Sequence, residues 1–93
     1  MIVGDLIVDR DEYLVYYKGN EFLLPRKEFE LLYLLSTSPK KVFTREEIFR
    51  NIWHKEITPF KGRTIDVHIR KLRSKISKNL IITIKGIGYR MAK

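Results

Sequence analysis

The chain has 93 residues, of which 44% are hydrophobic and 12% aromatic, and its formal net charge is +8. This length suits one domain, and the apolar content is that of a folded globule and not of a disordered basic tail. The lack of cysteine excludes disulfides, thiol chemistry and thiolate metal sites. No apolar run approaches the roughly 18 residues that span a bilayer, and no signal-peptide pattern opens the chain, so we expect a soluble, cytoplasmic protein without a membrane partner.

The positive charge is concentrated in the C-terminal part of the sequence. Residues 1–56 contain nine Lys or Arg and ten Asp or Glu, a net charge of −1. Residues 57–93 contain ten Lys or Arg and a single acid, a net charge of +9. A basic run is often only a solvated face, but segregation this complete favours a surface that binds an anionic polymer.

Residues 1–24 predict a small antiparallel sheet. The stretches "LIVD" and "YLVYYKGNEFLL" are rich in the β-branched, aromatic and aliphatic residues of strands. Gly19-Asn20 lies between two apolar runs and is typical of a hairpin turn. We therefore expect an N-terminal sheet over residues 1–24.

A three-helix core is predicted over residues 26–77. The apolar residues of "RKEFELLYLLS" surround most of a helix, which indicates burial on several sides. "TREEIFRNIW" begins with Thr44 and Glu47 at capping-box spacing, which predicts a second helix. Residues 54–62, with Pro59, predict a connecting loop, and the third helix is expected over residues 63–77.

The last stretch of the chain predicts a β-hairpin over residues 80–92. In "NLIITIKGIGYRMAK", apolar and polar residues alternate around Gly86 and Gly88. The predicted order of strands, three helices and a hairpin gives an α+β fold class in one domain of residues 1–93.

The third helix has two contrasting faces. Ile65, Ile69 and Leu72 recur at helical spacing and form a stripe that must face the core. The opposite face has four cations and no acid, which fits the major groove of DNA, and the apolar Val67 at its centre is a candidate for contact with a base edge. This outward face consists of Arg63, Thr64, Val67, Arg70, Lys71, Ser74 and Lys78.

Four other residues of this helix belong to neither face. Asp66 is expected to orient Arg70, its i,i+4 neighbour, or Arg73. Arg73 and Lys75 lie off the outward face, so we expect them to be solvated or paired with Asp66. His68 lies on the border between the two faces, where packing in the core and contact with DNA are both possible.

The sequence contains no recognisable catalytic constellation. Neither His54 nor His68 has a metal-ligating residue at i+3 or i+4. "GIGYRM" lacks the third glycine of a dinucleotide fingerprint, and Glu46 and Glu47 suit the first turn of a helix without a catalytic role. We therefore expect a protein that is not an enzyme and has no metal site and no cofactor.

Four motifs, in order, resemble the winged-helix DNA-binding domain of OmpR/PhoB-type bacterial response regulators. They are "EFELLYLL", "VFTREEIFRNIW", "RTIDVHIRKLRSKI" and "ITIKGIGYR". The resemblance covers nearly the whole chain. It implies an N-terminal four-stranded sheet, three helices and a C-terminal hairpin wing, with recognition helix 63–77 in the major groove and wing 80–92 near the minor groove.

The resemblance also implies which residues contact DNA. Lys85 stands where the wing often places a minor-groove Arg, a departure that favours a phosphate contact because Lys lacks the planar fork of Arg. For Trp53 and Tyr89, packing within the domain is an equal alternative. Pro25 stands before the first helix, where a capping Thr or Ser is common. This departure affects the stability of the helix and not DNA recognition. The implied DNA-binding residues are Arg63, Thr64, Val67, His68, Arg70 and Lys71 on the helix, with Val67 and Arg70 as base readers, and Arg45, Trp53, Thr83, Lys85 and Tyr89 around it.

The expected function is sequence-specific binding of double-stranded DNA for transcription regulation in a two-component system. A receiver domain precedes such domains, and we expect this chain to be an effector domain separated from one. We expect head-to-tail pairs on direct DNA repeats, and the resemblance implies contact with RNA polymerase through residues 54–62. A protein-interaction module and an RNA-binding domain are the alternatives; the latter is disfavoured because the basic helix face has no stacking aromatics.

Overall fold

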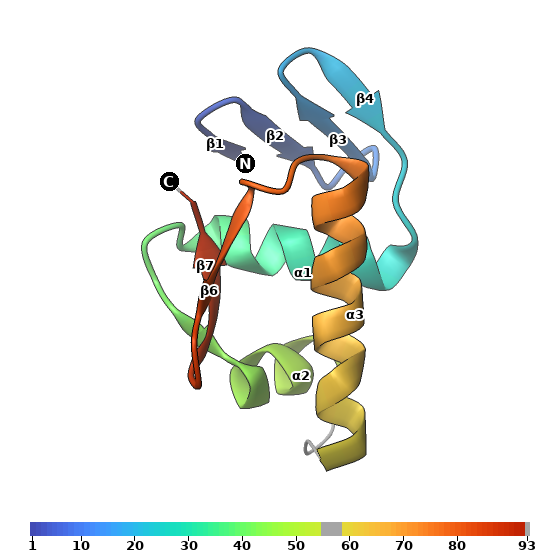
Figure 1. The fold of residues 1–93 in the computed structure, drawn as a ribbon. Helices are drawn as coiled ribbons and strands as arrows, with labels where there is room; N and C mark the ends of the chain where they lie inside the picture. Colours follow the sequence, from blue (N-terminus) through green and yellow to red (C-terminus); the bar gives the residue numbers. More distant parts are fainter. Residues whose placement is uncertain (55–58, 93) are drawn as a thin grey trace.

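The N-terminal sheet predicted over residues 1–24 is confirmed in the computed structural model, which describes residues 1–54 and 59–92. Neighbouring strands pair antiparallel in chain order, and the sheet lies at one end of the molecule (Figure 1). Leu6, Val8 and Val15 point into the core, whereas Ile7 is exposed, as the alternation of a strand requires. The strands are β1 (Ile2–Val3), β2 (Leu6–Asp9), β3 (Leu14–Tyr17) and β4 (Asn20–Phe22).

The turn between β3 and β4 differs by one residue from the expected Gly19-Asn20. Its two central residues are Lys18 and Gly19, which have φ angles of 49° and 83°. Asn20 is already the first residue of β4 and pairs with Tyr17. A two-residue hairpin turn with two positive φ angles matches the right-handed twist of the strands, which explains why the turn is placed there.

Helix α1 (Arg26–Thr37) passes beneath this sheet and is buried on several sides, as predicted. Phe29, Leu31, Leu32 and Leu35 are each at most 1% exposed. The helix begins after Pro25, which forms no side-chain cap, as its chemistry dictates.

Helix α2 (Arg45–Trp53) begins with the predicted capping box. The backbone N–H of Glu47 donates to the Thr44 hydroxyl over 3.1 Å, and the backbone N–H of Thr44 donates to the Glu47 carboxylate over 3.0 Å. The helix ends at Trp53 and is followed by its C-cap residue His54, which adopts the left-handed conformation with φ 57°.

Helix α3 (Pro59–Lys75) is longer at its start than predicted. Residues 59–62 were expected to belong to the connecting loop, yet they form the first turn. Proline is favoured there because its missing N–H has no partner inside a helix and its φ is already helical. The helix ends at Lys75 and not at residue 77, and the N–H of Ile76 still bonds the carbonyl of Leu72 over 2.9 Å.

The C-terminal hairpin predicted over residues 80–92 is present as β6 (Ile81–Ile84) and β7 (Gly88–Met91). A third strand, β5 (Phe43–Thr44), pairs antiparallel with β7 and was not predicted, because two residues are too few for a recognisable pattern. Gly88 permits this pairing, since a Cβ there would lie 1.9 Å from the carbonyl oxygen of Phe43. The segment before α2 is therefore joined to the hairpin.

One hydrophobic core connects both sheets and all three helices. Helix α3 crosses α1, and the β6–β7 hairpin lies beside α3 (Figure 1). This arrangement is the α+β winged helix expected from the sequence. Within the described residues, no helix combines the length and the apolar character needed to cross a membrane.

Candidate nucleic-acid interface

The two predicted faces of α3 are confirmed. Ile65, Ile69 and Leu72 are at most 1% exposed and pack in the core. This apolar stripe fixes the rotation of the helix about its own axis, and therefore fixes which side chains point outward.

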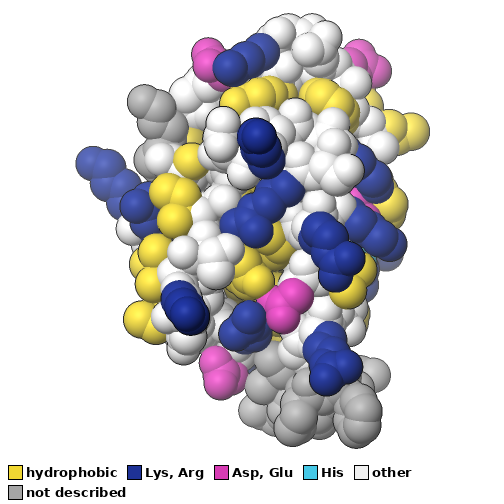
Figure 2. All heavy atoms as spheres, in the orientation of Figure 1, with side chains coloured by type: hydrophobic (Ala, Val, Ile, Leu, Met, Phe, Trp, Pro, Cys, Tyr) yellow, Lys and Arg dark blue, Asp and Glu magenta, His cyan; other side chains and the backbone are white. Residues whose placement is uncertain are grey.

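The outward face of α3 presents cations around an apolar centre. Arg63, Arg70 and Lys71 are exposed, and Val67 between them is 38% exposed. Within the part of the chain whose side chains the structure describes, none of these three cations forms an ion pair. Figure 2 shows Lys and Arg side chains spread over the face on which α3 and the hairpin lie. The face therefore has positive charge available for an anionic ligand.

Asp66 does not pair with Arg70 or Arg73, contrary to the prediction. Its Oδ1 accepts hydrogen bonds from Arg45 Nε over 3.1 Å and from the Tyr89 hydroxyl over 2.5 Å. The hydrogen bond to Asp66 raises the pKa of the Arg45 guanidinium. The pKa of the Tyr89 hydroxyl is also raised, mainly by burial and secondly by its hydrogen bond to Asp66. The i,i+4 pattern failed because the side chain of Asp66 turns toward α2 and β7 and not along its own helix.

Arg73 joins α3 to the first strand of the hairpin, a contact that the sequence did not predict. Its guanidinium donates to the carbonyl of Ile81 over 2.8 Å and to the hydroxyl of Thr83 over 2.7 Å. It also lies over the ring of Tyr89, with Cζ 5.9 Å from the ring centroid, and Arg45 approaches the same ring at 5.8 Å. Thr83 and Tyr89 are thus held by side chains of the helices, and Tyr89 is only 5% exposed.

The structure packs most of the His68 side chain against its neighbours in the domain. The ring stacks on Trp53 at 5.7 Å, and Trp53 in turn stacks on Phe49 at 4.8 Å. The side chain of His68 is 18% exposed, its Nδ1 is buried, and burial lowers its pKa. Trp53 remains partly exposed, with Lys27 Nζ 5.6 Å from its ring.

Glu28 is a buried acid that the sequence analysis did not single out. It is 2% exposed and accepts a hydrogen bond from Lys75 over 2.8 Å, so Lys75 pairs with Glu28 and not with Asp66, while 40% of the Lys75 side chain stays exposed to solvent as expected. His68 Nδ1 lies 3.8 Å from the same carboxylate. Glu28 stands among the other charged residues at the start of α1, in "RKEFE", so no local pattern indicated that this acid would be buried.

The turn of the hairpin presents Lys85 and Ile87 to solvent. Lys85 is exposed, and Ile87 is 53% exposed. Gly86 between them has a φ of 76°, and the N–H of Ile87 bonds the carbonyl of Ile84 over 2.9 Å. An exposed apolar side chain at the tip was not predicted; its position after a turn glycine was the only hint in the sequence.

The family model for "Transcriptional regulatory protein, C terminal" matches residues 19–91. The chain belongs to this family. Among its relatives, the heme response regulator HssR of Staphylococcus aureus (strain bovine RF122 / ET3-1) is 37% identical over 97 residues. That match covers 98% of this chain and 42% of HssR, so the chain spans about two fifths of the relative's length.

Solved structures agree with this assignment to the family. The DNA-binding domain of CpxR from Escherichia coli is 32% identical with a TM-score of 0.86, covering 98% of this chain and 93% of the other. The DNA-binding domain of Klebsiella pneumoniae RstA, in complex with the RstA box, is 26% identical with a TM-score of 0.88, covering 99% and 95%. The winged helix of this chain is thus that of OmpR/PhoB-type response regulators.

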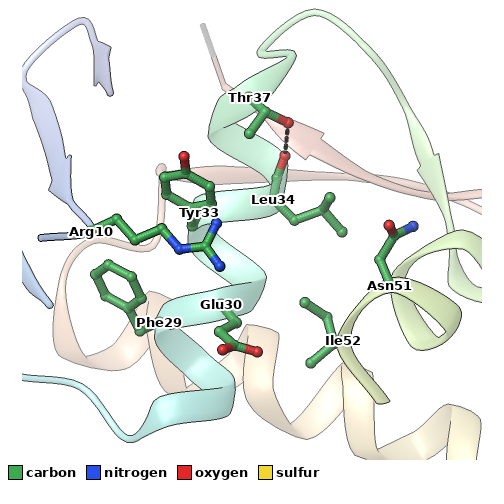
Figure 3. A pocket seen from close by; sticks show the side chains of 8 residues that line it. All are labelled: Arg10, Phe29, Glu30, Tyr33, Leu34, Thr37, Asn51 and Ile52. Carbon is green, nitrogen blue, oxygen red and sulfur yellow. Dashed lines mark hydrogen bonds between the residues drawn. The ribbon is translucent and has the colours of Figure 1, made fainter. Parts of the chain in front are cut away.

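Residues 55–58, in the segment expected to contact RNA polymerase, lie outside the described residues. A pocket of about 180 Å³ opens between α1 and α2 (Figure 3), and no residue of α3 or the hairpin lines it. The pocket is lined by Arg10, Phe29, Glu30, Tyr33, Leu34, Thr37, Asn51 and Ile52.

Among the described residues, no group of three or more His, Cys, Asp or Glu could hold a metal ion.

Proposed function

We propose that this domain binds double-stranded DNA in a sequence-specific manner, with α3 in the major groove and the hairpin near the minor groove. The observation that supports this most directly is the outward face of α3, where exposed cations surround Val67. An α-helix fits the major groove, and a valine can contact the methyl group of thymine. Phosphate attraction alone gives no reason for an exposed apolar residue at the centre of this face.

The proposed contacts divide into two classes. Arg70 and Val67 read base edges, whereas Arg63, Thr64 and Lys71 hold the phosphates on either side. Arg45, at the N-terminus of α2, and Lys85, at the tip of the hairpin, add phosphate contacts from the flanks. Trp53 and Thr83, which remain partly or fully exposed, are proposed to add contacts to the DNA backbone. Tyr89 and most of the His68 side chain pack within the domain and are proposed to support these groups from there.

We also propose the larger assembly in which this binding takes place. The relatives are more than twice as long as this chain, which is consistent with an effector domain attached to a receiver domain in a cytoplasmic two-component system. Two copies bind head to tail on direct repeats about one helical turn apart. Residues 54–62 are the proposed contact with RNA polymerase. The proposed mechanism is recruitment to DNA and not catalysis.

Selection of bound sites from a random duplex pool tests the proposal. We expect the selected duplexes to share one sequence motif, repeated in the same orientation at a spacing of about one helical turn. Recovery of a single unrepeated motif would contradict the binding of two copies to direct repeats. Recovery of no motif would contradict sequence-specific binding, and the protein-interaction module would then be the better hypothesis.

A further inference from the structure

Asp66 is an acid in a region where the proposed function would favour none. It is the only Asp or Glu among residues 57–93, and its side chain is 40% exposed beside the cations of α3. A carboxylate near phosphate repels it, so attraction to DNA cannot account for Asp66. Its contacts provide another explanation.

One oxygen of Asp66 connects three elements of the proposed interface. Oδ1 lies on α3 and accepts from Arg45 Nε, at the start of α2, over 3.1 Å. The same atom accepts from the Tyr89 hydroxyl, on β7, over 2.5 Å. Hydrogen bonds to an ionised acceptor are shorter and stronger than neutral ones, so these two bonds restrict the positions of both partners.

The neighbouring contacts extend this connection to the rest of the hairpin. The ring of Tyr89 lies near the guanidinium groups of both Arg45 and Arg73, and Arg73 donates to β6 at Ile81 and Thr83. The apolar core alone would allow small rotations of the hairpin against α3, because hydrophobic contacts are not directional. Directional bonds at Asp66 remove that freedom.

We propose that Asp66 is a positioning residue that sets the placement of Arg45 and of the hairpin relative to α3, and thereby sets sequence specificity. This inference depends on the proposed function, since it assigns the residue that aligns the parts of that interface. The carboxylate weakens the general attraction to phosphate. In return, the base-reading helix and its flanking phosphate contacts meet the duplex in one arrangement.

The Asp66→Asn variant tests this inference, because charge and positioning predict opposite results. Removing a negative charge should strengthen binding to all duplexes if Asp66 acts only through its charge. If it acts by positioning, affinity for the duplex selected by the wild-type domain should fall about tenfold, while affinity for random duplex stays the same or rises. The ratio of the two affinities is the measured quantity.

The Glu46→Gln variant is the matched control. Glu46 is exposed in the first turn of α2, next to Arg45, and its replacement changes the net charge by the same amount. We expect this variant to bind both duplexes slightly more tightly and to keep the wild-type ratio. If Asp66→Asn behaves in the same way, the positioning role is wrong. A loss of preference at a single base pair would also overturn it, because that result indicates direct contact between Asp66 and a base.

The Tyr89→Phe variant provides an independent test that leaves the net charge and the ring unchanged. We expect its affinity ratio to fall in the same direction, and we expect the double variant with Asp66→Asn to lose less than the product of the two single losses. A wild-type ratio for Tyr89→Phe would overturn the inference even if Asp66→Asn failed to fold. The proposed function fails separately, if the wild-type domain itself does not prefer the selected duplex.

Discussion

At the scale of single residues, a buried carboxylate helps to hold α3 against α1. It belongs to Glu28, and its neighbours on α3 are His68 and Lys75. The buried carboxylate of Glu28 requires a partner, because an isolated charge in the interior is costly. Lys75 provides it, and His68 lies close to the same carboxylate without a hydrogen bond. Helix α3 is therefore attached to the domain by a polar contact near its C-terminal end as well as by its apolar stripe.

The burial of His68 predicts a pH dependence of stability. Burial lowers its pKa, an effect that Lys71 and Lys75 strengthen and Glu28 opposes. Because the unfolded state then binds the proton more readily than the folded state, the free energy of unfolding should decrease as pH falls below the ordinary histidine pKa of about 6.5. Urea unfolding at about pH 7.5 and about pH 5.5, a window above the titration of ordinary carboxylates, should show a larger loss for the wild type than for His68→Gln. Equal losses would contradict the prediction.

Arg70 provides a second prediction at the scale of residues. Arg70→Ala should weaken binding to the selected duplex by about 1–3 kcal/mol and relax base preference at one position, because an arginine at the centre of the face is placed to read a base edge. Binding of the variant to a set of singly substituted duplexes measures this. If selected and random duplexes weaken equally, Arg70 contacts only phosphate.

At the scale of elements, the hairpin depends on a close contact with β5. Gly88 lies opposite Thr44, where no side chain fits between the strands. This pairing joins the hairpin to the segment that caps α2, so two of the proposed phosphate-contacting elements share one small sheet. A substitution that breaks the pairing of β5 with β7 should therefore displace both the hairpin and the N-terminus of α2.

Gly88→Ala should destabilise the domain by about 1–3 kcal/mol, because the added Cβ meets backbone atoms that cannot move away. Thermal unfolding of the variant measures the loss. Gly86→Asn is the control, since nothing lies within 4 Å of a Cβ there and asparagine tolerates a positive φ. An unchanged unfolding temperature for Gly88→Ala would contradict the steric role of this contact.

At the scale of the whole molecule, the charge segregation of the sequence becomes a spatial arrangement. The nearly neutral first part of the chain forms the N-terminal sheet, α1 and α2, whereas the basic part forms α3 and the hairpin (Figures 1 and 2). A basic face on one side of a small domain attracts a polyanion and orients it as it approaches.

This arrangement predicts a strong dependence of DNA binding on salt. If about five to seven phosphates are contacted, the logarithm of the affinity should fall with the logarithm of the salt concentration at a slope of roughly −5 to −6. Lys85→Ala should weaken binding to all duplexes alike and reduce the slope by about one. A flat response in the wild type would contradict DNA binding, and an unchanged slope in the variant would show that the hairpin tip does not contact phosphate.

Much of the candidate interface could be predicted because its signals are local. The stripe of Ile65, Ile69 and Leu72 determines which side of α3 faces outward, and the capping box at Thr44 determines where α2 begins. The two-residue strand β5 and the exact hairpin turn at Lys18 and Gly19 could not be predicted, because pairing with another strand and backbone twist decide them.

The sequence by itself determined the order of the elements, the inward stripe of α3 and the basic face opposite it, since helical and strand periodicity depend on near neighbours in the chain. Only the tertiary structure decided the polar partners. Asp66 bonds residues 21 and 23 positions away, and Lys75 bonds a residue 47 positions away, over distances at which no periodicity operates. Those partners are set by how the helices and the hairpin pack, and they overrode the i,i+4 pairing that the sequence of α3 offered.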